Sequence, residues 1–192
     1  MYENLKRKIV QDMVKNGMIE KEDTELYCFG IDALKTYVGA IVMTLGIGLL
    51  MDSFWESLIF FISFKLLRVE AGGFHASSNV KCIIISIGML VTSFYMIKNV
   101  LILFPLIAVV MCFILSVVVV WLYAPLPDEN KPINEKETVY HRRKSRCIVI
   151  METIIAMMLY SRFKYVSITI MMAVFVVTLS LVAWKIMRKL KK

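Results

Sequence analysis

The chain has 192 residues, of which 59% are hydrophobic, and its mean hydropathy is +0.71. Soluble domains are typically about 45–50% apolar, so this composition excludes an ordinary water-surrounded fold and favours a membrane protein. The formal net charge is +8, but the placement of the basic residues, described below, argues against nucleic-acid binding. The first thirty residues are rich in charge and do not have the pattern of a cleaved signal peptide.

Residues 1–19 have an amphipathic pattern. The apolar positions fall at helical spacing, and they are Leu5, Ile9, Val10, Met13, Val14 and Met18. Lysine, aspartate and other polar residues occupy the remaining positions. This pattern predicts an amphipathic helix that either lies in the membrane interface or packs on the rest of the protein.

Six apolar segments follow, at 33–51, 54–67, 82–97, 100–124, 147–160 and 165–184. A helix needs about 20 apolar residues to cross a bilayer. The fourth and sixth segments are long enough outright, and the first and third reach that length with their flanks. The second and fifth are short and interrupted by charge, which predicts tilted or partial crossings. We therefore expect an all-α, polytopic membrane protein with about six transmembrane or partly spanning helices, preceded by the amphipathic helix.

The placement of lysine and arginine predicts the orientation. Of the 23 basic residues, 20 lie before the first segment, between the second and third, between the fourth and fifth, or after the sixth, when Lys35 just inside the first segment and Lys65 at the end of the second are counted with the adjoining stretches. Basic residues are enriched on the cytoplasmic side of membrane proteins. Both termini, the polar stretch 68–82 and the basic loop 125–147 are therefore expected in the cytoplasm. We interpret 1–192 as a single integral membrane domain, with 1–30 as its cytoplasmic N-terminal region.

The stretch 68–82 is polar, although it lies between two apolar segments. It contains the pair Gly72-Gly73, one of only two histidines in the chain, His75, and the thiol of Cys82. Polar groups next to hydrocarbon are costly, so this stretch is a candidate functional site. The glycine pair permits positive φ and the close approach of a substrate backbone.

His75 and Cys82 can meet only if the chain turns between them. Seven residues of helix rise about 10.5 Å, which is too far for a hydrogen bond. Ser77, Ser78 and Asn79 favour a turn and a helix N-cap, which would place Cys82 in the first turn of the next helix. A thiol in that position, with an imidazole nearby, is a candidate nucleophile. From the spacing alone, a capped interfacial turn in which both residues are incidental accounts for the pattern equally well.

The charged residues around this pair have more than one interpretation. Arg68 either contacts lipid phosphate, or binds a carboxylate or orients a carbonyl in the site. Glu70 either orients His75 or pairs with Arg68 or Lys65. Glu152 is either a buried partner of Arg68 or Lys65 or a carboxylate that extends to the interface. Because there is no Cys-x-x-Cys pair, we predict neither a metal site nor a cofactor.

Two motifs resemble a known family. The arrangement Arg68…Gly72-Gly73-Phe74-His75-Ala76…Cys82 resembles the accessory gene regulator protein B family of membrane cysteine endopeptidases. A second segment, Tyr123-Ala124-Pro125…Glu129-Asn130-Lys131-Pro132, resembles the stretch that follows the fourth hydrophobic segment of that family. The chain length and the spacing of the apolar segments agree as well, so the resemblance covers nearly the whole chain.

The resemblance implies an enzyme of the bacterial cell membrane that processes an AgrD-type precursor peptide for quorum sensing. In such an enzyme, Cys82 would be the nucleophile and His75 the general base. The acyl-enzyme thioester would then be intercepted within the precursor, which closes a thiolactone or lactone ring. Arg68 and Gly73 match family positions that are needed for activity. The resemblance also implies a homodimer.

The basic cluster at Arg142, Arg143 and Lys144 is a candidate site for the acidic tail of such a precursor. Anchoring to anionic membrane lipid is the more ordinary explanation of these charges. A function of another class is a small transporter or peptide-binding membrane protein without covalent chemistry, in which His75 would carry protons or contact substrate.

Overall fold

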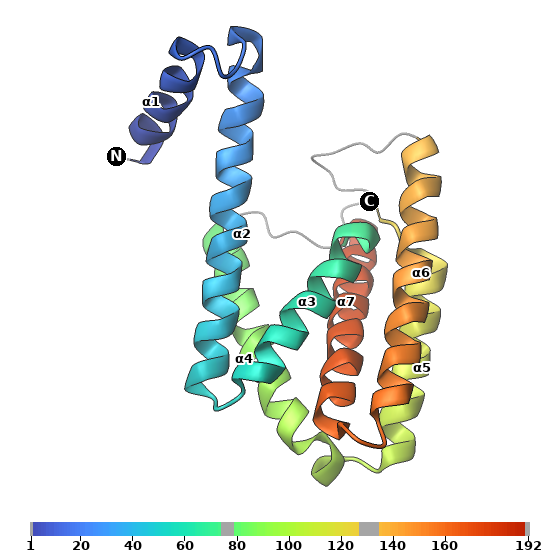
Figure 1. Cartoon of the computed structure of the whole chain (residues 1–192). Coiled ribbons are helices and arrows are strands. Elements are labelled where there is room, and N and C mark those ends of the chain that lie inside the picture. Colours follow the sequence, from blue (N-terminus) through green and yellow to red (C-terminus); the bar gives the residue numbers. More distant parts are fainter. Residues whose placement is uncertain (1, 74–78, 127–134, 191–192) are drawn as a thin grey trace. The chain divides into compact units, whose positions relative to one another are not determined.

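The computed structural model describes residues 2–73, 79–126 and 135–190, and within them it is all-α, as predicted (Figure 1). The described part contains seven α-helices and one short 3-10 helix. Contacts divide the chain into two units, Met1–Met43 and Thr44–Lys192. Each unit is described by itself below.

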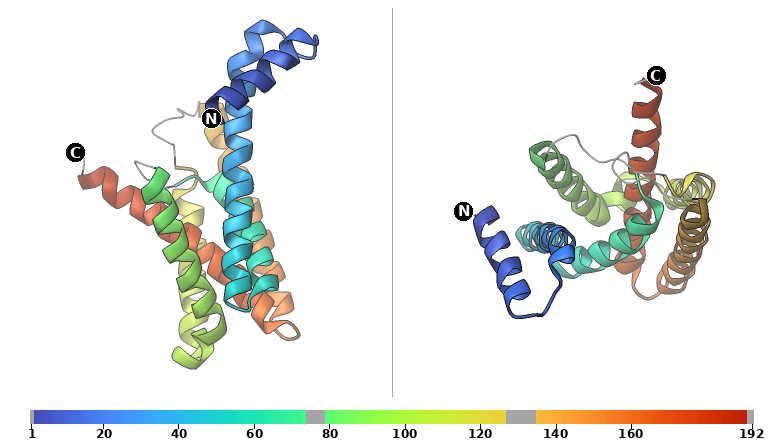
Figure 2. Two further views of the ribbon diagram at one scale, coloured as in Figure 1. Left: turned by 90° about the vertical axis from the view of Figure 1, so that its left-hand side faces the viewer. Right: turned by 90° about the horizontal axis from the view of Figure 1, so that it is seen from above.

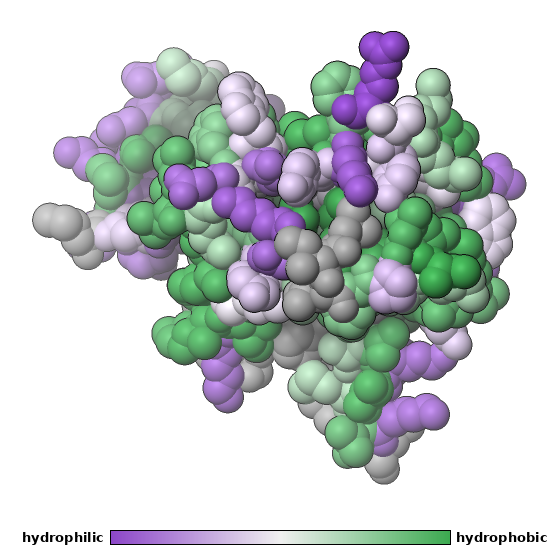
Figure 3. Space-filling model, turned by 90° about the horizontal axis from the view of Figure 1, so that it is seen from below, coloured by the Kyte–Doolittle hydropathy of each residue, from purple (hydrophilic) through white to green (hydrophobic). Residues whose placement is uncertain are grey.

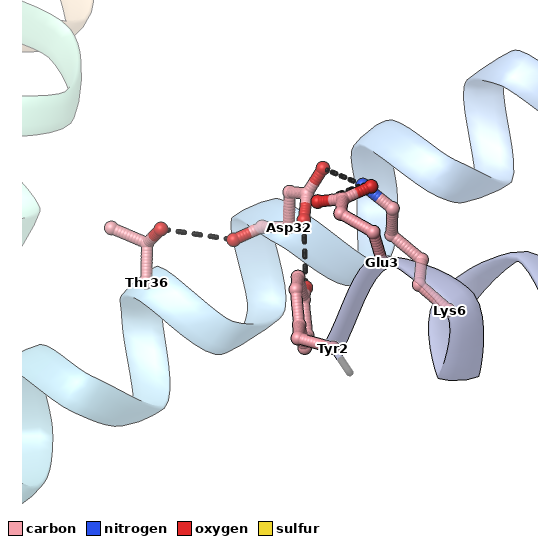
Figure 4. A network of polar contacts seen from close by, with 5 residues as sticks. All are labelled: Tyr2, Glu3, Lys6, Asp32 and Thr36. Carbon is pink, nitrogen blue, oxygen red and sulfur yellow. Dashed lines mark hydrogen bonds and ion pairs between the residues drawn. The ribbon is translucent and has the colours of Figure 1, made fainter.

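The first unit consists of α1 (Tyr2–Lys15), the 3-10 helix η1 (Lys21–Asp23) and the first part of α2 (Thr24–Leu50). Asp32 of α2 holds α1, because its carboxylate accepts hydrogen bonds from Tyr2 Oη at 2.7 Å and Lys6 Nζ at 2.6 Å (Figure 4). The hydrogen bond with Asp32 raises the pKa of Lys6. Val10 is buried, whereas Leu5 and Ile9 are 57% and 43% exposed. The predicted amphipathic helix is therefore present, and much of its apolar face remains open.

The second unit contains the end of α2 and five further helices, α3 (Phe54–Ala71), α4 (Asn79–Leu103), α5 (Leu106–Tyr123), α6 (Glu135–Leu159) and α7 (Lys164–Leu190). The helices α3, α5 and α6 all pack against α7 (Figure 2). Their shared core includes Leu67, Val120, Val149, Val174 and Val177, all fully buried. The helix α4 packs mainly against α7 and α5, its Phe94 ring meets Phe60 of α3 edge-on at 5.7 Å, and most of its first half is exposed.

Four described helical stretches are long and apolar enough to cross a membrane: Lys21–Leu50, Val80–Val100, Leu106–Tyr123 and Lys164–Leu190. They correspond to the first, third, fourth and sixth predicted segments. The second and fifth became α3 and α6, which are at least as long as α5 but are not apolar enough in the described residues to join these four. Apolar side chains cover much of the surface in Figure 3, as expected where lipid takes the place of water.

The predicted segment 100–124 is wrong as one element, because the chain breaks at Pro105. The helix α4 continues to Leu103 and α5 begins at Leu106. Proline has no backbone N–H and disfavours helical geometry in the residue before it, so α4 must end there. The carbonyl of Pro105 then accepts the first hydrogen bonds of α5, from the N–H groups of Ala108 and Val109.

The predicted loop 125–147 is also wrong over its second part, which is helical from Glu135 onward. Its residues are mostly charged, and the glutamates, lysines and arginines among them are good helix formers. The apolar periodicity that indicates a helix in the sequence begins only near Cys147. Consequently, the basic cluster lies on the first half of α6 and not in a loop.

Candidate active site

Cys82 is the fourth residue of α4, and its side chain is exposed. The helix starts at Asn79, as the turn-forming residues before it predicted. The first backbone N–H groups of a helix have no partner within the helix, and they carry partial positive charge that favours an anion. His75 lies outside the described residues, with Phe74 and 76–78.

The glycine pair ends α3 in a backbone conformation that other residues rarely adopt. The φ angle is 69° at Gly72 and 127° at Gly73. The N–H of Leu126 donates to the carbonyl of Ala71 at 3.0 Å, and Gly72 and Leu126 form a parallel bridge. A Cβ atom at Gly72 would collide with the Leu126 carbonyl oxygen. The close approach predicted at this glycine is therefore made by the chain's own backbone.

This bridge joins the two motifs that carry the family resemblance. Leu126 directly follows Tyr123-Ala124-Pro125, in which the Ala124–Pro125 peptide bond is cis. The backbone after α5 is thus hydrogen-bonded to the backbone that leads from α3 toward the candidate nucleophile. The second half of the second motif, 129–132, lies outside the described residues.

Arg68, in the last turn of α3, connects the glycine pair to α7. Its Nη1 donates to the carbonyl of Gly72 and to Ser180 Oγ, the latter at 2.7 Å. Ser180 Oγ in turn donates to the carbonyl of Val177 at 2.7 Å. A Cβ atom at Gly73 would collide with Arg68 Nη1 and lie 2.8 Å from Ser180 Oγ. Arg68 thus donates to a backbone carbonyl of its own chain and to a serine of α7, and its role toward lipid or substrate stays a prediction.

Glu70 faces α6, a pairing that the sequence did not suggest. Its Oε2 lies 2.6 Å from His141 Nδ1, and its Oε1 accepts from Lys144 Nζ at 3.4 Å. The hydrogen bond with Tyr140, and next the one with Glu70, raise the pKa of Lys144. These contacts join the C-terminal end of α3 to the basic half of α6. No periodic signal links residues 70 and 141, so sequence reasoning had no means of finding the pair.

The predicted tail-binding residues differ in their surroundings. Arg142, Arg143 and Lys144 are all exposed on α6, and Lys144 also contacts Glu70. Nearby, Arg146 donates to the carbonyl of Trp121 on α5 at 3.2–3.3 Å, and its guanidinium carbon lies 4.6 Å from the centre of the Trp121 ring. Arg142 and Arg143 are therefore the more accessible charged side chains of this cluster.

Glu152 is buried between α3 and α6. Its Oε1 accepts a hydrogen bond from Ser63 Oγ at 2.7 Å, and its exposure is 4%. Among the described residues, no group donates to the other oxygen, Oε2. Glu152 thus connects two helices inside the bundle, and it does not extend to the interface.

Apart from the Glu152–Ser63 hydrogen bond, which lies away from the helix ends, these contacts gather at one end of the second unit. The C-terminal ends of α3, α5 and α7 and the N-terminal half of α6 meet there, and Lys185 Nζ of α7 lies 3.5 Å from the centre of the Tyr123 ring. Among the described residues, no group of three His, Cys, Asp or Glu side chains could hold a metal ion. All four cysteines are free thiols. The class defined by this fold and site is a helical membrane protein with an exposed thiol at the start of an apolar helix.

The chain matches the model of the family Accessory gene regulator B over residues 6–183, and it belongs to that family. It is 31% identical over 150 residues to an AgrB-like protein of Clostridium perfringens strain SM101, covering 75% of this chain and 70% of that protein. It is 25% identical over 146 residues to an AgrB-like protein of Halalkalibacterium halodurans, covering 73% and 69%. No solved structure matches the chain.

The family predicted from the two motifs is therefore confirmed. Members of this family are generally cysteine endopeptidases, and membership implies a role in processing AgrD-type precursor peptides.

Proposed function

We propose that this chain is a membrane-embedded cysteine endopeptidase that removes the C-terminal tail of an AgrD-type precursor and closes the remaining peptide into a thiolactone or lactone. The observation that carries the proposal is the family match over residues 6–183, which includes the segment of Cys82 and His75. The exposed thiol of Cys82, in the first turn of α4, supports it.

The proposed chemistry is two successive acyl transfers. His75 takes the proton of the Cys82 thiol, and the sulfur attacks the carbonyl carbon of the scissile peptide bond. The carbon–nitrogen bond breaks, and the proton passes to the amine of the departing tail. A thiol or hydroxyl within the retained peptide then attacks the thioester, which forms the ring and restores the Cys82 thiol.

Ring closure requires that water does not reach the thioester first. A site at the membrane surface, with apolar helices around it, helps to exclude water. When the attacking group is a thiol, one thioester replaces another, so the exchange is nearly isoenergetic. The precursor would reach the site along the membrane surface.

We assign positioning roles to the residues between the helices. Arg68 and Gly73 hold the end of α3 against α7, and Gly72 seats it against Leu126. Glu70 ties the same end to α6. Together these contacts fix where the segment leading to His75 and Cys82 begins.

The site, both chain termini and the basic half of α6 are proposed to face the cytoplasm. The charge distribution supports this orientation, because the basic residues of the N-terminal half of α6 and of the end of α7 lie at the same end of the second unit as Arg68. Arg142 and Arg143 remain candidates for the acidic tail of the precursor or for anionic lipid. A homodimer remains an expectation from the family.

The proposal is tested by assaying membranes for release of the precursor tail with Cys82→Ser and, separately, His75→Ala. We expect both variants to lose cleavage, and we expect Cys147→Ser, another exposed thiol, to cleave at the native rate. The substrate in the assay is an AgrD-type precursor peptide, the class that the family match implies. Native-rate release of the tail by Cys82→Ser would contradict the assignment.

A further inference from the structure

A large apolar cavity lies between α4, α5 and α7, apart from the contacts described above. Its volume is about 670 Å³, within the range of roughly 300–1,000 Å³ that is typical of ligand sites. The wall from α4 consists of Gly88, Met89, Thr92, Ser93, Met96 and Val100. The hydroxyl of Thr92 donates to the carbonyl of Gly88 at 2.8 Å on its own helix, so the α4 wall presents mainly carbon and sulfur.

The cavity lies on the same face of α4 as Cys82. Residues seven apart on a helix point in nearly the same direction, and Cys82, Met89 and Met96 follow that spacing. The edge of the cavity at Met89 is about 10.5 Å along the helix axis from Cys82, because each residue rises about 1.5 Å. An extended peptide covers that distance in about three residues.

We propose that this cavity binds apolar side chains of the precursor that lie within about four residues before the cleaved bond. The inference rests on the proposed function, and it assigns a specificity site to it. The acyl part of the substrate stays attached to Cys82 after the tail leaves, so only residues before the cleaved bond can occupy the cavity throughout the reaction. Holding those residues would also keep the acyl chain near the thioester while its ring closes.

The lining suits peptide side chains of differing shape. Methionine is flexible and polarisable, and it adapts to irregular apolar partners; Met89 and Met96 of α4 face Met171 and Met172 of α7 across the cavity. Continuity with the face of Cys82 favours a peptide held by the thiol over a free lipid chain.

The first test fills the cavity with a bulky side chain. Thr92 lines it, whereas the near-isosteric neighbour Val91 is not among the lining residues and points about 100° away around the helix; both side chains are exposed. We expect Thr92→Trp to lower kcat/KM for precursor cleavage about tenfold or more, mainly through KM, while Val91→Trp stays near the native value. Removing apolar contacts in a pocket typically costs 10–200-fold in discrimination, which sets this scale.

The same assay is repeated with precursors in which the apolar residues before the cleaved bond are replaced by alanine. We expect these replacements to lower kcat/KM about tenfold with the native chain and to have little further effect with Thr92→Trp. Equal losses with both enzymes would overturn the proposal, because the two changes would then act independently.

A binding test keeps this proposal separate from the proposed function. The photoreactive amino acid benzoylphenylalanine replaces Met89, or Ile87 as control, in the Cys82→Ala variant, and a tagged AgrD-type precursor is the probe. Ile87 lies on the opposite face of α4 and is 41% exposed. We expect the precursor to crosslink at position 89 and not at 87.

Crosslinks at 89 only to lipid or to a second copy of the chain would overturn the cavity assignment, even if the native chain cleaves. Crosslinks to the precursor without cleavage by the native chain would support the cavity and refute the peptidase.

Discussion

Arg68 shows how a residue can be needed for a site without acting on the substrate. One nitrogen of its guanidinium donates both to the carbonyl of Gly72 and to Ser180 Oγ of α7. The planar guanidinium holds the two N–H groups of that nitrogen in fixed directions, whereas a lysine ammonium is a compact charge on a flexible stem. The arrangement therefore supports a positioning role for Arg68 at the end of α3.

Ser180→Ala tests this role, because Ser180 contacts the site through Arg68. We expect both Ser180→Ala and Arg68→Lys to slow precursor cleavage, and we expect the double variant to be little worse than Arg68→Lys. The coupling between the two changes should be about 0.5–3 kcal/mol, as for residues in one hydrogen-bond network. Cleavage rates of the four proteins give the cycle. Additive effects would indicate that Arg68 acts on the substrate independently of α7.

Gly73→Ala is expected to disturb the same place more strongly. The φ angle of 127° is unfavourable for alanine, and the new Cβ would collide with Arg68. Strained backbone of this kind costs on the order of 1–3 kcal/mol. We expect a lower thermal unfolding midpoint in detergent and lost cleavage. Gly46→Ala, in a helix with open space around the site of the new methyl, should keep both properties.

At the scale of the elements, the start of α4 and the division into four long and two interrupted segments follow from local signals. The start of α4 was predicted from the turn-forming residues before Asn79. The division into segments was predicted from the length of the apolar runs. The break at Pro105 was also readable, because proline in the interior of a helix breaks or kinks it, but the apolar run continues through it. The helical first half of α6 was missed because it has no apolar stripe of the kind that indicates an amphipathic helix.

The helix α1 is expected to depend on Asp32 for its attachment to α2. Asp32→Asn removes the negative charge that binds Lys6. It also leaves only one side-chain oxygen to accept the two hydrogen bonds from Tyr2 and Lys6. We expect faster amide hydrogen exchange throughout Tyr2–Lys15 in the variant, measured in detergent by mass spectrometry. The control is Glu25→Gln, an exposed acidic residue earlier in α2. Unchanged exchange with Asp32→Asn would show that Val10 and its apolar neighbours suffice.

At the scale of the whole molecule, the orientation in the membrane remains a prediction from charge. A variant that keeps Cys82 as its single cysteine, with the other three changed to serine, tests it in membrane vesicles. We expect a membrane-impermeant maleimide to label Cys82 in inverted vesicles and not in right-side-out ones. A second variant carries its single cysteine through Arg162→Cys, in the exposed turn between α6 and α7, and should show the reverse. Labelling of Cys82 from outside the cell would refute the predicted orientation.

The sequence by itself determined the helical membrane fold, the family and the place of Cys82 at the start of a helix. Hydropathy, helix capping and short motifs are local properties, and each is legible within a few turns of chain. Only the tertiary structure decided that Gly72 meets Leu126, that Arg68 reaches Ser180 and that Glu70 faces His141. It also decided that a cavity opens on the Cys82 face of α4. These features depend on how distant helices pack, and helix packing leaves no periodic trace in the sequence of either partner.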